Sequence, residues 1–276
     1  MKKNLVITLI VFLLAPLAAE PSLQEVMELA VFREDFRQAS GPMEMILVDR
    51  TENEIRFGLT SYDLGDQDGF YRILAFTDPD RVNGTVLLID DPHGEGGERI
   101  LLLEPDTGEV EPLTSLADTF QGSDISYYDF FKPNVNDYNY SLYQEGRVEG
   151  QVVWVILAVP VDEGVIARTG YTKSLYFIRK DNYQIIRSKH WTRRPDEVKY
   201  FLVREEVMID SLWYPSRLEV LVRRSGEVYH QTLLNRLVID RETVLGKSLF
   251  TPEGMLLLRQ DLLFEPELEL DQEETP

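Results

Sequence analysis

Cysteine is absent from all 276 residues of this sequence. Its absence excludes disulfide bonds, thiolate nucleophiles and the cysteine-based sites that hold zinc or iron–sulfur clusters. It also excludes a lipid anchor on an N-terminal cysteine. Long apolar runs are missing as well. Beyond residue 19 the longest is Val152 to Val159, which is far short of the ~20 residues that a membrane-spanning helix needs.

Basic residues are scarce. The chain has 28 Lys and Arg against 48 Asp and Glu, which gives a formal net charge of -20. Nucleic acids and bare anionic lipid surfaces attract proteins through clustered Lys and Arg. The charge therefore argues against nucleic acid as a partner, and contact with a membrane is expected to be transient. The acidic residues 265–276 are expected to form a disordered, solvated tail.

The first residues have the pattern of a cleavable signal peptide at 1–19. Lys2 and Lys3 precede an apolar stretch from Leu5 to Leu14, and Leu17 to Ala19 provide a small-residue cleavage site. We therefore expect a periplasmic protein that is exported without a lipid anchor. Its folded part is expected to be one domain, residues 20–264.

Signals for catalysis or metal binding are weak. His93 stands among acids between Asp90 and Glu98, but this stretch is rich in Gly and Pro and separates two predicted strands, so a polar hairpin loop is favoured over a metal site. The acids between Leu64 and Gly69 lack the ligand spacing of a calcium loop. Because no nucleophile elbow, zinc-protease motif or phosphate-binding loop occurs, we expect no metal, no cofactor and no enzymatic activity. A hydrolase built on Asp124 or His93 is the third and least favoured alternative.

A helix is predicted over residues 23–38. Ser22 and Glu25 have the spacing of a capping box, in which each side chain satisfies the other residue's backbone N–H. Apolar residues then recur at the helical period, and Ser40-Gly41-Pro42 is expected to stop the run. The helix should therefore lie on an apolar surface.

From Met43 onward the apolar period changes to two, which is typical of strands. About eleven strands are predicted, separated by turn residues such as Asn83-Gly84 and Ser225-Gly226. Their ranges are 43–50, 54–61, 70–77, 85–90, 99–104, 151–159, 171–179, 183–191, 200–208, 216–224 and 228–240. Short connections without intervening helices predict an antiparallel meander and argue against a parallel Rossmann or TIM arrangement.

Two of these strands, Ile100 to Leu103 and Val152 to Val159, are apolar on both faces. They should therefore be covered on both sides. Only the first helix and the segment 115–143 appear long enough to cover them. The predicted fold is mainly β with a few helices: a strongly curved antiparallel sheet, an incomplete β-barrel, whose concave face the helices cover. A two-sheet sandwich is the alternative.

The segment 118–143 combines acids, hydroxyls and a dense set of aromatic residues. One interpretation is a loop and short helix that plug the end of the core, with Asp124 as the helix cap. The other is a rim or lid, in which amphipathic aromatic side chains separate a hydrophobic ligand from water.

Two strings in this chain resemble a known family. One runs from Asp78-Pro79 through Asn83-Gly84-Thr85 into an apolar strand, and the other is the run Phe120 to Asp129, with Phe120, Gly122, Ser123 and Asp124 at its motif positions. Tyr171-Thr172-Lys173 fits as well. On these residues the chain resembles the outer-membrane lipoprotein-sorting proteins of the LolA-like superfamily, and within it a larger, mostly uncharacterised branch. The resemblance covers roughly residues 22–255 and implies an incomplete barrel with an apolar hollow for acyl chains.

The resemblance implies a carrier that takes acyl chains of lipoproteins or lipids from an inner-membrane donor complex or an RND-type exporter to an outer-membrane acceptor. The alternative is a binding or assembly module of the same fold, accessory to an envelope export pump. Candidate hollow and lid residues are apolar or aromatic: Leu23, Met27, Ala30, Val31, Ile55, Phe57, Leu59, Phe120, Tyr127, Tyr128, Phe131, Val153, Val155 and Leu157.

Overall fold

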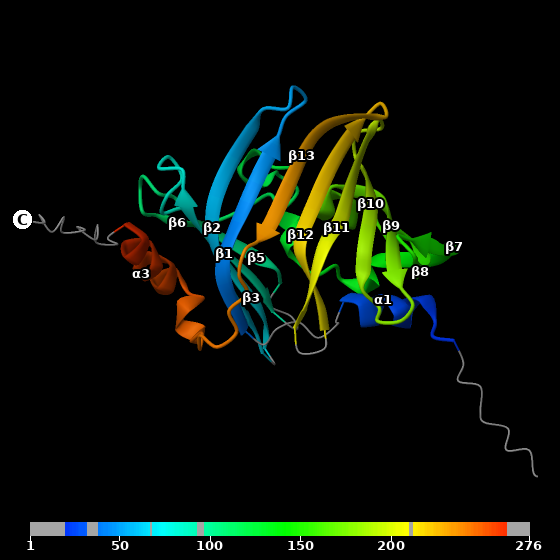
Figure 1. The fold of residues 1–276 in the computed structure, drawn as a ribbon, viewed down its shortest axis with the longest axis horizontal. Helices are drawn as coiled ribbons and strands as arrows, with labels where there is room; N and C mark the ends of the chain where they lie inside the picture. The colour runs from blue at the N-terminus through cyan, green and yellow to red at the C-terminus, as the bar shows by residue number, and fades with distance from the viewer. Residues whose placement is uncertain (1–19, 32–37, 67, 93–96, 210–211, 264–276) are drawn as a thin grey trace, which may run out of the picture.

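The computed structural model describes residues 20–31, 38–66, 68–92, 97–209 and 212–263 (Figure 1). The expected signal peptide, the expected acidic tail and His93 lie outside these ranges. Within them, all strands belong to one antiparallel sheet. Its strand order is β6-β5-β4-β3-β2-β1-β13-β12-β11-β10-β9-β8-β7, so the sheet is open, with β6 and β7 at its edges.

The thirteen strands follow the chain as a meander in two halves. Strands that follow each other in sequence pair, except β6 and β7, which lie at opposite edges, and the pair of β1 with β13 joins the halves. Their bounds are β1 Gln38–Val48, β2 Glu54–Gly65, β3 Gly69–Asp78, β4 Val86–Pro92, β5 Arg99–Leu103, β6 Val110–Pro112, β7 Tyr138–Val148, β8 Gln151–Pro160, β9 Tyr171–Arg179, β10 Ile185–Thr192, β11 Glu197–Ile209, β12 Leu212–Arg224 and β13 Glu227–Arg236.

The predicted antiparallel meander is confirmed, whereas the two-sheet sandwich and the count of about eleven strands are wrong. The strands missed are β6 and β7. The first has only three residues, and the second is an edge strand whose side chains are largely exposed, so neither shows alternating apolar residues. The sequence also predicts a strongly curved, incomplete barrel; the structure has a single antiparallel sheet that is open and not strongly curled.

Three α-helices are described: α1 Leu23–Val31, α2 Glu163–Thr169 and α3 Pro252–Leu263. None of them has the length and apolar character needed to cross a membrane. The predicted capping box is confirmed, because the Ser22 N–H donates to Glu25 Oε2 at 2.7 Å and the Glu25 N–H donates to Ser22 Oγ at 3.2 Å.

The predicted stop at Ser40-Gly41-Pro42 is wrong, because these residues belong to β1. Ser40 forms an isolated β-bridge with Asp240, and this bridge brings the segment that follows β13 against Gly41. Gly41 has φ +150°, and a Cβ there would lie 2.3 Å from the Val238 carbonyl oxygen. Glycine therefore serves a close backbone approach within a strand rather than a helix end.

Strands β3 to β5 are apolar on both faces, and each face has its own cover. On the outer face, Ile73, Leu88 and Leu103 pack against Met255 and Leu258 of α3, which Figure 1 shows at the opposite end of the molecule from α1. The prediction that Ile100 to Leu103 would be covered on both sides is confirmed. One cover is nevertheless α3, which was not predicted, because three consecutive leucines in its sequence obscure the helical period.

The inner face of the same strands packs against the cover segment, residues 113–131, which carries two short 3-10 helices, η1 Phe120–Gly122 and η2 Tyr127–Phe130. In the half of the sheet that ends at β7, the inner positions Ile156 and Ala158 of β8 pack instead with α1 and with Val135 of η3 Val135–Asp137. The cover segment and α1 therefore shield different parts of the inner face.

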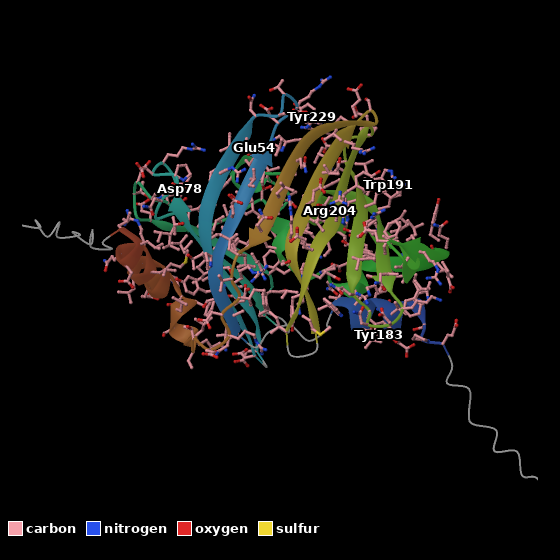
Figure 2. All side chains as sticks on the ribbon, in the orientation of Figure 1. Glu54, Asp78, Tyr183, Trp191, Arg204 and Tyr229 are labelled. Carbon is pink, nitrogen blue, oxygen red and sulfur yellow. The ribbon has the colours of Figure 1, made fainter. Side chains whose placement is uncertain are left out.

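The outer face of the central strands has a polar network beside apolar residues such as Ile46 and Leu202. Arg204 of β11 pairs with Glu219 of β12, and Gln231 of β13 donates to the same carboxylate at 2.6 Å. Figure 2 shows Arg204 on this face. This outer face is therefore mixed, since Ile46 and Leu202 on it are buried, whereas the inner face supports the cover.

Candidate functional site

Two adjoining pockets lie between the inner face of the central strands and the cover segment. The first has a volume of about 250 Å³ and is lined by Met43, Leu59, Asp63, Phe70, Arg72, Leu74, Phe120, Ile125, Asp129, Phe130, Phe201, Tyr214, Pro215, Ser216, Leu218, Leu234, Arg236 and Ile239.

The second also has about 250 Å³ and is lined by Tyr128, Asp129, Phe131, Pro133, Tyr138, Tyr171, Tyr176, Ile185, Ser188, His190, Phe201, Val203, Pro215 and Leu218. The two share Asp129, Phe201, Pro215 and Leu218. They therefore lie next to each other, and the lining of each is mostly apolar.

The motif string at Phe120 is a tight turn within the cover segment. The Phe120 N–H donates to the Ile125 carbonyl oxygen at 2.8 Å, and Ser123 Oγ accepts from the Ile125 N–H at 3.1 Å. Gly122 has φ +76°, a backbone conformation that glycine adopts without strain. The turn places the buried Phe120 ring against Phe130 and Phe76, at centroid distances of 5.0 and 5.5 Å.

Asp124 fastens this turn to β13. Its carboxylate accepts from His230 Nδ1 at 2.8 Å and from Thr232 Oγ1 at 2.9 Å, and its backbone N–H donates to Thr232 Oγ1 at 2.9 Å. The hydrogen bond to Asp124 raises the pKa of His230. The interpretation of Asp124 as a helix cap is therefore wrong. The cap of the following helix is Ser126, which forms a capping box with Asp129.

Asp129 is the second fastening point, and it is buried. Its Oδ2 accepts from Lys199 Nζ of β11 at 3.0 Å and its Oδ1 from the Tyr171 hydroxyl of β9 at 2.5 Å. Both side chains of the ion pair are less than a tenth exposed. Burial alone would raise the pKa of Asp129, but the Lys199 ammonium and the Tyr171 hydroxyl outweigh it, so the pKa lies below its usual range. Two carboxylates thus attach the cover to three strands.

Lys199, Tyr171 and His190 were not predicted as site residues. A signal exists for Lys199, because it occupies an inward position of β11 in phase with Phe201 and Val203, where an apolar residue is expected. His190 lies between two hydroxyls, with Ser174 Oγ 2.7 Å from its Nδ1 and Ser188 Oγ 2.7 Å from its Nε2. Burial lowers the pKa of His190 to about 4.

The free energy of unfolding is therefore expected to fall as the pH decreases from 6.5 to 4. Folded His190 stays neutral in this range while the unfolded chain, with its ordinary histidine pKa of 6.5, takes up a proton. The unfolded state then binds more protons, which costs the folded state about 1.4 kcal/mol per pH unit. Urea unfolding between pH 4.5 and 7 measures the slope. In the His190→Gln variant the slope should become markedly flatter, and an unchanged slope would contradict the assignment.

A charged group occupies one end of the first pocket. The buried Asp63 accepts from Arg72 Nε at 2.5 Å and from Arg236 Nη2 at 2.9 Å. Burial alone would raise the pKa of Asp63, but the two guanidinium groups outweigh it and lower the pKa. Among the described residues, no group of three or more His, Asp or Glu side chains is placed to hold a metal ion.

The predicted site residues fall into three groups. Six meet where the inner face packs against the cover segment: Phe57 and Leu59 belong to β2, and Phe120, Tyr127, Tyr128 and Phe131 belong to the cover itself. Leu59 and Phe120 line the first pocket, and Tyr128 and Phe131 line the second. The α1 residues Leu23, Met27, Ala30 and Val31 pack against β7 to β9 and line neither pocket.

The third group lies away from both pockets. Val153, Val155 and Leu157 occupy the outer face of β8, where they pack with Leu175, while Ile55 is 48% exposed. Pocket residues that were not predicted include Leu74, Phe201, Leu218 and Leu234. Their signal was the alternation of their strands, which shows two faces but does not show which of them faces inward.

Solved structures of other proteins have the same fold. A putative outer-membrane lipoprotein-sorting protein domain from Vibrio parahaemolyticus superposes with a TM-score of 0.75 at 22% identity, covering 84% of this chain and 97% of that chain. A DUF1329 family protein from Desulfovibrio piger gives 0.73 at 19% identity, with the same coverage. A LolA superfamily protein from Nitrosomonas europaea gives 0.64 at 15% identity, covering 85% of this chain and 100% of that one.

No curated protein sequence matches the chain at a significant level. Residues 70–256 match the model of a protein family described as "Uncharacterized protein". This match includes β3 to β13, the cover segment and the motif string at Phe120. The chain therefore belongs to that family, and its sheet has the fold of the LolA-like outer-membrane lipoprotein-sorting proteins.

Proposed function

We propose that this protein is a non-enzymatic periplasmic carrier that binds acyl chains of lipoproteins or lipids between its open sheet and the cover segment. The observation that supports the proposal best is the pair of adjoining pockets, whose shared wall includes Phe201 and Leu218. Ligand pockets commonly span about 300–1,000 Å³ and are mostly apolar. Each pocket has about 250 Å³, so a ligand that occupied both would have a volume within this range.

Binding and release follow from the same apolar surface. Each methylene sheltered from water contributes ~0.8 kcal/mol, so one acyl chain can be held firmly. In the described structure, aromatic residues of the cover, among them Phe120, Tyr128 and Phe131, line these pockets. A ligand must compete with them for the inner face, which keeps the net affinity moderate and lets a tighter acceptor withdraw the chain. The sheet and cover would then act as the half-barrel of the carrier.

The proposed route runs from an inner-membrane donor complex or an RND-type exporter to an outer-membrane acceptor, after export by the predicted signal peptide. The net charge of -20 would keep the carrier from adsorbing to anionic bilayers. Its partners should therefore be proteins with basic docking surfaces, because complementary charge accelerates specific encounter.

Native mass spectrometry of protein purified from its own envelope, combined with uptake of a fluorescent fatty acid, tests the proposal. Bound acyl species and saturable uptake are expected. Protein that is consistently free of ligand and takes up no fatty acid would overturn the carrier. Recovery of a protein partner by cross-linking from such ligand-free material would instead favour the assembly module.

Filling the first pocket should abolish much of the uptake. Leu234 of β13 lines this pocket, so tryptophan in its place would occupy the space that an acyl chain needs. We expect the dissociation constant of a fluorescent fatty acid to rise about tenfold or more, which corresponds to at least ~1.4 kcal/mol. The matched control is Ile55→Trp on β2, a position that is 48% exposed and lines neither pocket. Equal loss in both variants would contradict binding in this pocket.

A further inference from the structure

The lining of the first pocket includes a cluster of charged residues from β2, β3 and β13. On β13, Arg236 pairs with Met43 of β1, while Leu234 and Thr232 pair with the following inward positions of β1. On β3, Arg72 stands opposite Asp63 of β2 and precedes the inward-facing Leu74. The ion pairs with Asp63 thus gather charges from three strands in one part of the pocket, its charged end, and Asp129, which pairs with Lys199, is the other charged residue in its lining.

This charged end has more positive than negative charge. Asp63 has a side chain 4% exposed, and it pairs with Arg72 and Arg236, whose side chains are 23% and 18% exposed. Among the described residues, both guanidinium groups form their ion pairs with this one carboxylate. One arginine is enough to neutralise Asp63, so the three groups together have a formal charge of +1. A partly buried cation excess is costly unless a counter-charge approaches it.

The excess is notable in a protein whose formal net charge is -20. Both arginines also line the pocket, and each guanidinium has five N–H donors, of which the ion pairs with Asp63 use one. The remaining donors have the planar geometry that suits a carboxylate or a phosphate. A neutral ester or amide would leave the positive charge without a counter-charge.

We propose that the ligand of this pocket is a single-chain amphiphile with an anionic head, a carboxylate or a phosphate, bound by Arg72 and Arg236 while its chain lies along Leu59, Leu74 and Leu234. This inference rests on the proposed carrier function and narrows its cargo. It favours free fatty acids and lipid phosphates over acyl groups that are joined to a protein through neutral bonds.

Displacement of a neutral apolar naphthylamine dye from the purified protein tests the proposal, with dodecanoate, dodecyl phosphate, dodecanol and inorganic phosphate as competitors. The two anionic amphiphiles are expected to bind about tenfold more tightly than dodecanol. Inorganic phosphate should not displace the dye at the concentrations that suffice for dodecyl phosphate. This comparison uses the wild-type chain and does not depend on the folding of any variant.

Arg236→Met removes the excess charge and keeps the pair of Asp63 with Arg72. The ratio between the affinities for dodecanoate and dodecanol should fall toward one. Arg204→Met is the matched control, because Arg204 is also paired with a carboxylate on this sheet but does not line either pocket. In Arg204→Met the ratio between the affinities for dodecanoate and dodecanol should equal that of the wild type.

The outcomes separate the two proposals. Failure of the dye and of every amphiphile to bind would overturn the carrier function itself. Two results would overturn the proposal that the ligand has an anionic head and leave the carrier proposal standing. One is equal affinity of the wild type for dodecanoate and dodecanol, and the other is a preference for dodecanoate that the Arg236→Met variant retains. If inorganic phosphate displaced the dye as strongly as dodecyl phosphate does, the arginines would form a simple anion site, and the proposal of an amphiphilic ligand would be wrong.

Discussion

Replacing Asp129 by alanine is expected to lower the free energy of unfolding by about 3–5 kcal/mol, because it leaves a buried charge without its partner. Lys199 lies 3.0 Å from Asp129 Oδ2 and is itself buried, and Tyr171 and Ser126 also donate to this carboxylate. Through Lys199 and Tyr171, Asp129 joins the cover segment to β11 and β9. Urea unfolding followed by circular dichroism measures the change.

Two further variants show whether the loss comes from the ion pair. Asp118→Ala alters an exposed carboxylate of the same cover segment and should change stability by less than about 0.5 kcal/mol. The double variant Asp129→Ala with Lys199→Met also removes the ammonium group that Asp129→Ala leaves unpaired, so it should recover part of the lost free energy of unfolding. If the double variant is as unstable as the sum of the single variants, the two side chains are not coupled and the proposed fastening is wrong.

Loss of the Asp129 attachment also has a consequence for ligand binding. The cover would be held mainly by Asp124 and by its aromatic residues, so the inner face should become accessible to water more often. Binding of an environment-sensitive apolar dye is expected to increase in Asp129→Ala under conditions where the variant remains folded. Unchanged dye binding would indicate that the cover stays in place without this ion pair.

The second large effect is expected for Phe120→Ala, which should destabilise the protein by about 3–5 kcal/mol. The Phe120 side chain is 1% exposed and meets Phe130 edge-on at 5.0 Å, Phe76 at 5.5 Å and Tyr127 at 5.9 Å. Alanine would remove these contacts and leave a cavity that joins the first pocket. Differential scanning calorimetry and urea unfolding give the size of the loss.

Tyr143→Ala is the matched control, because Tyr143 is an aromatic residue of β7 whose exposed fraction is 63%. It should be nearly neutral in the same measurement. The enlarged pocket of Phe120→Ala is also expected to accept a bulkier fluorescent acyl probe than the wild type does. A stability loss near that of Tyr143→Ala would show that the motif phenylalanine does not belong to the core.

Several features followed from local sequence pattern alone. The period of two predicted the meander, the Ser22–Glu25 spacing predicted the start of α1, and apolar residues on both faces of Ile100 to Leu103 predicted two covers. These predictions held because backbone hydrogen bonding and side-chain alternation depend on residues close together in the chain. The absence of cysteine likewise excluded whole classes of chemistry without any structure.

Only the tertiary structure decided which face of each strand is inward. A period of two describes both faces of a strand equally, so the sequence could not place Ile156 rather than Val155 under α1. Long-range pairs were equally hidden. Asp124 bonds Thr232 108 residues away, and Asp129 pairs with Lys199 70 residues away. The register of a thirteen-stranded sheet brings these groups together, and that register is a property of the whole fold.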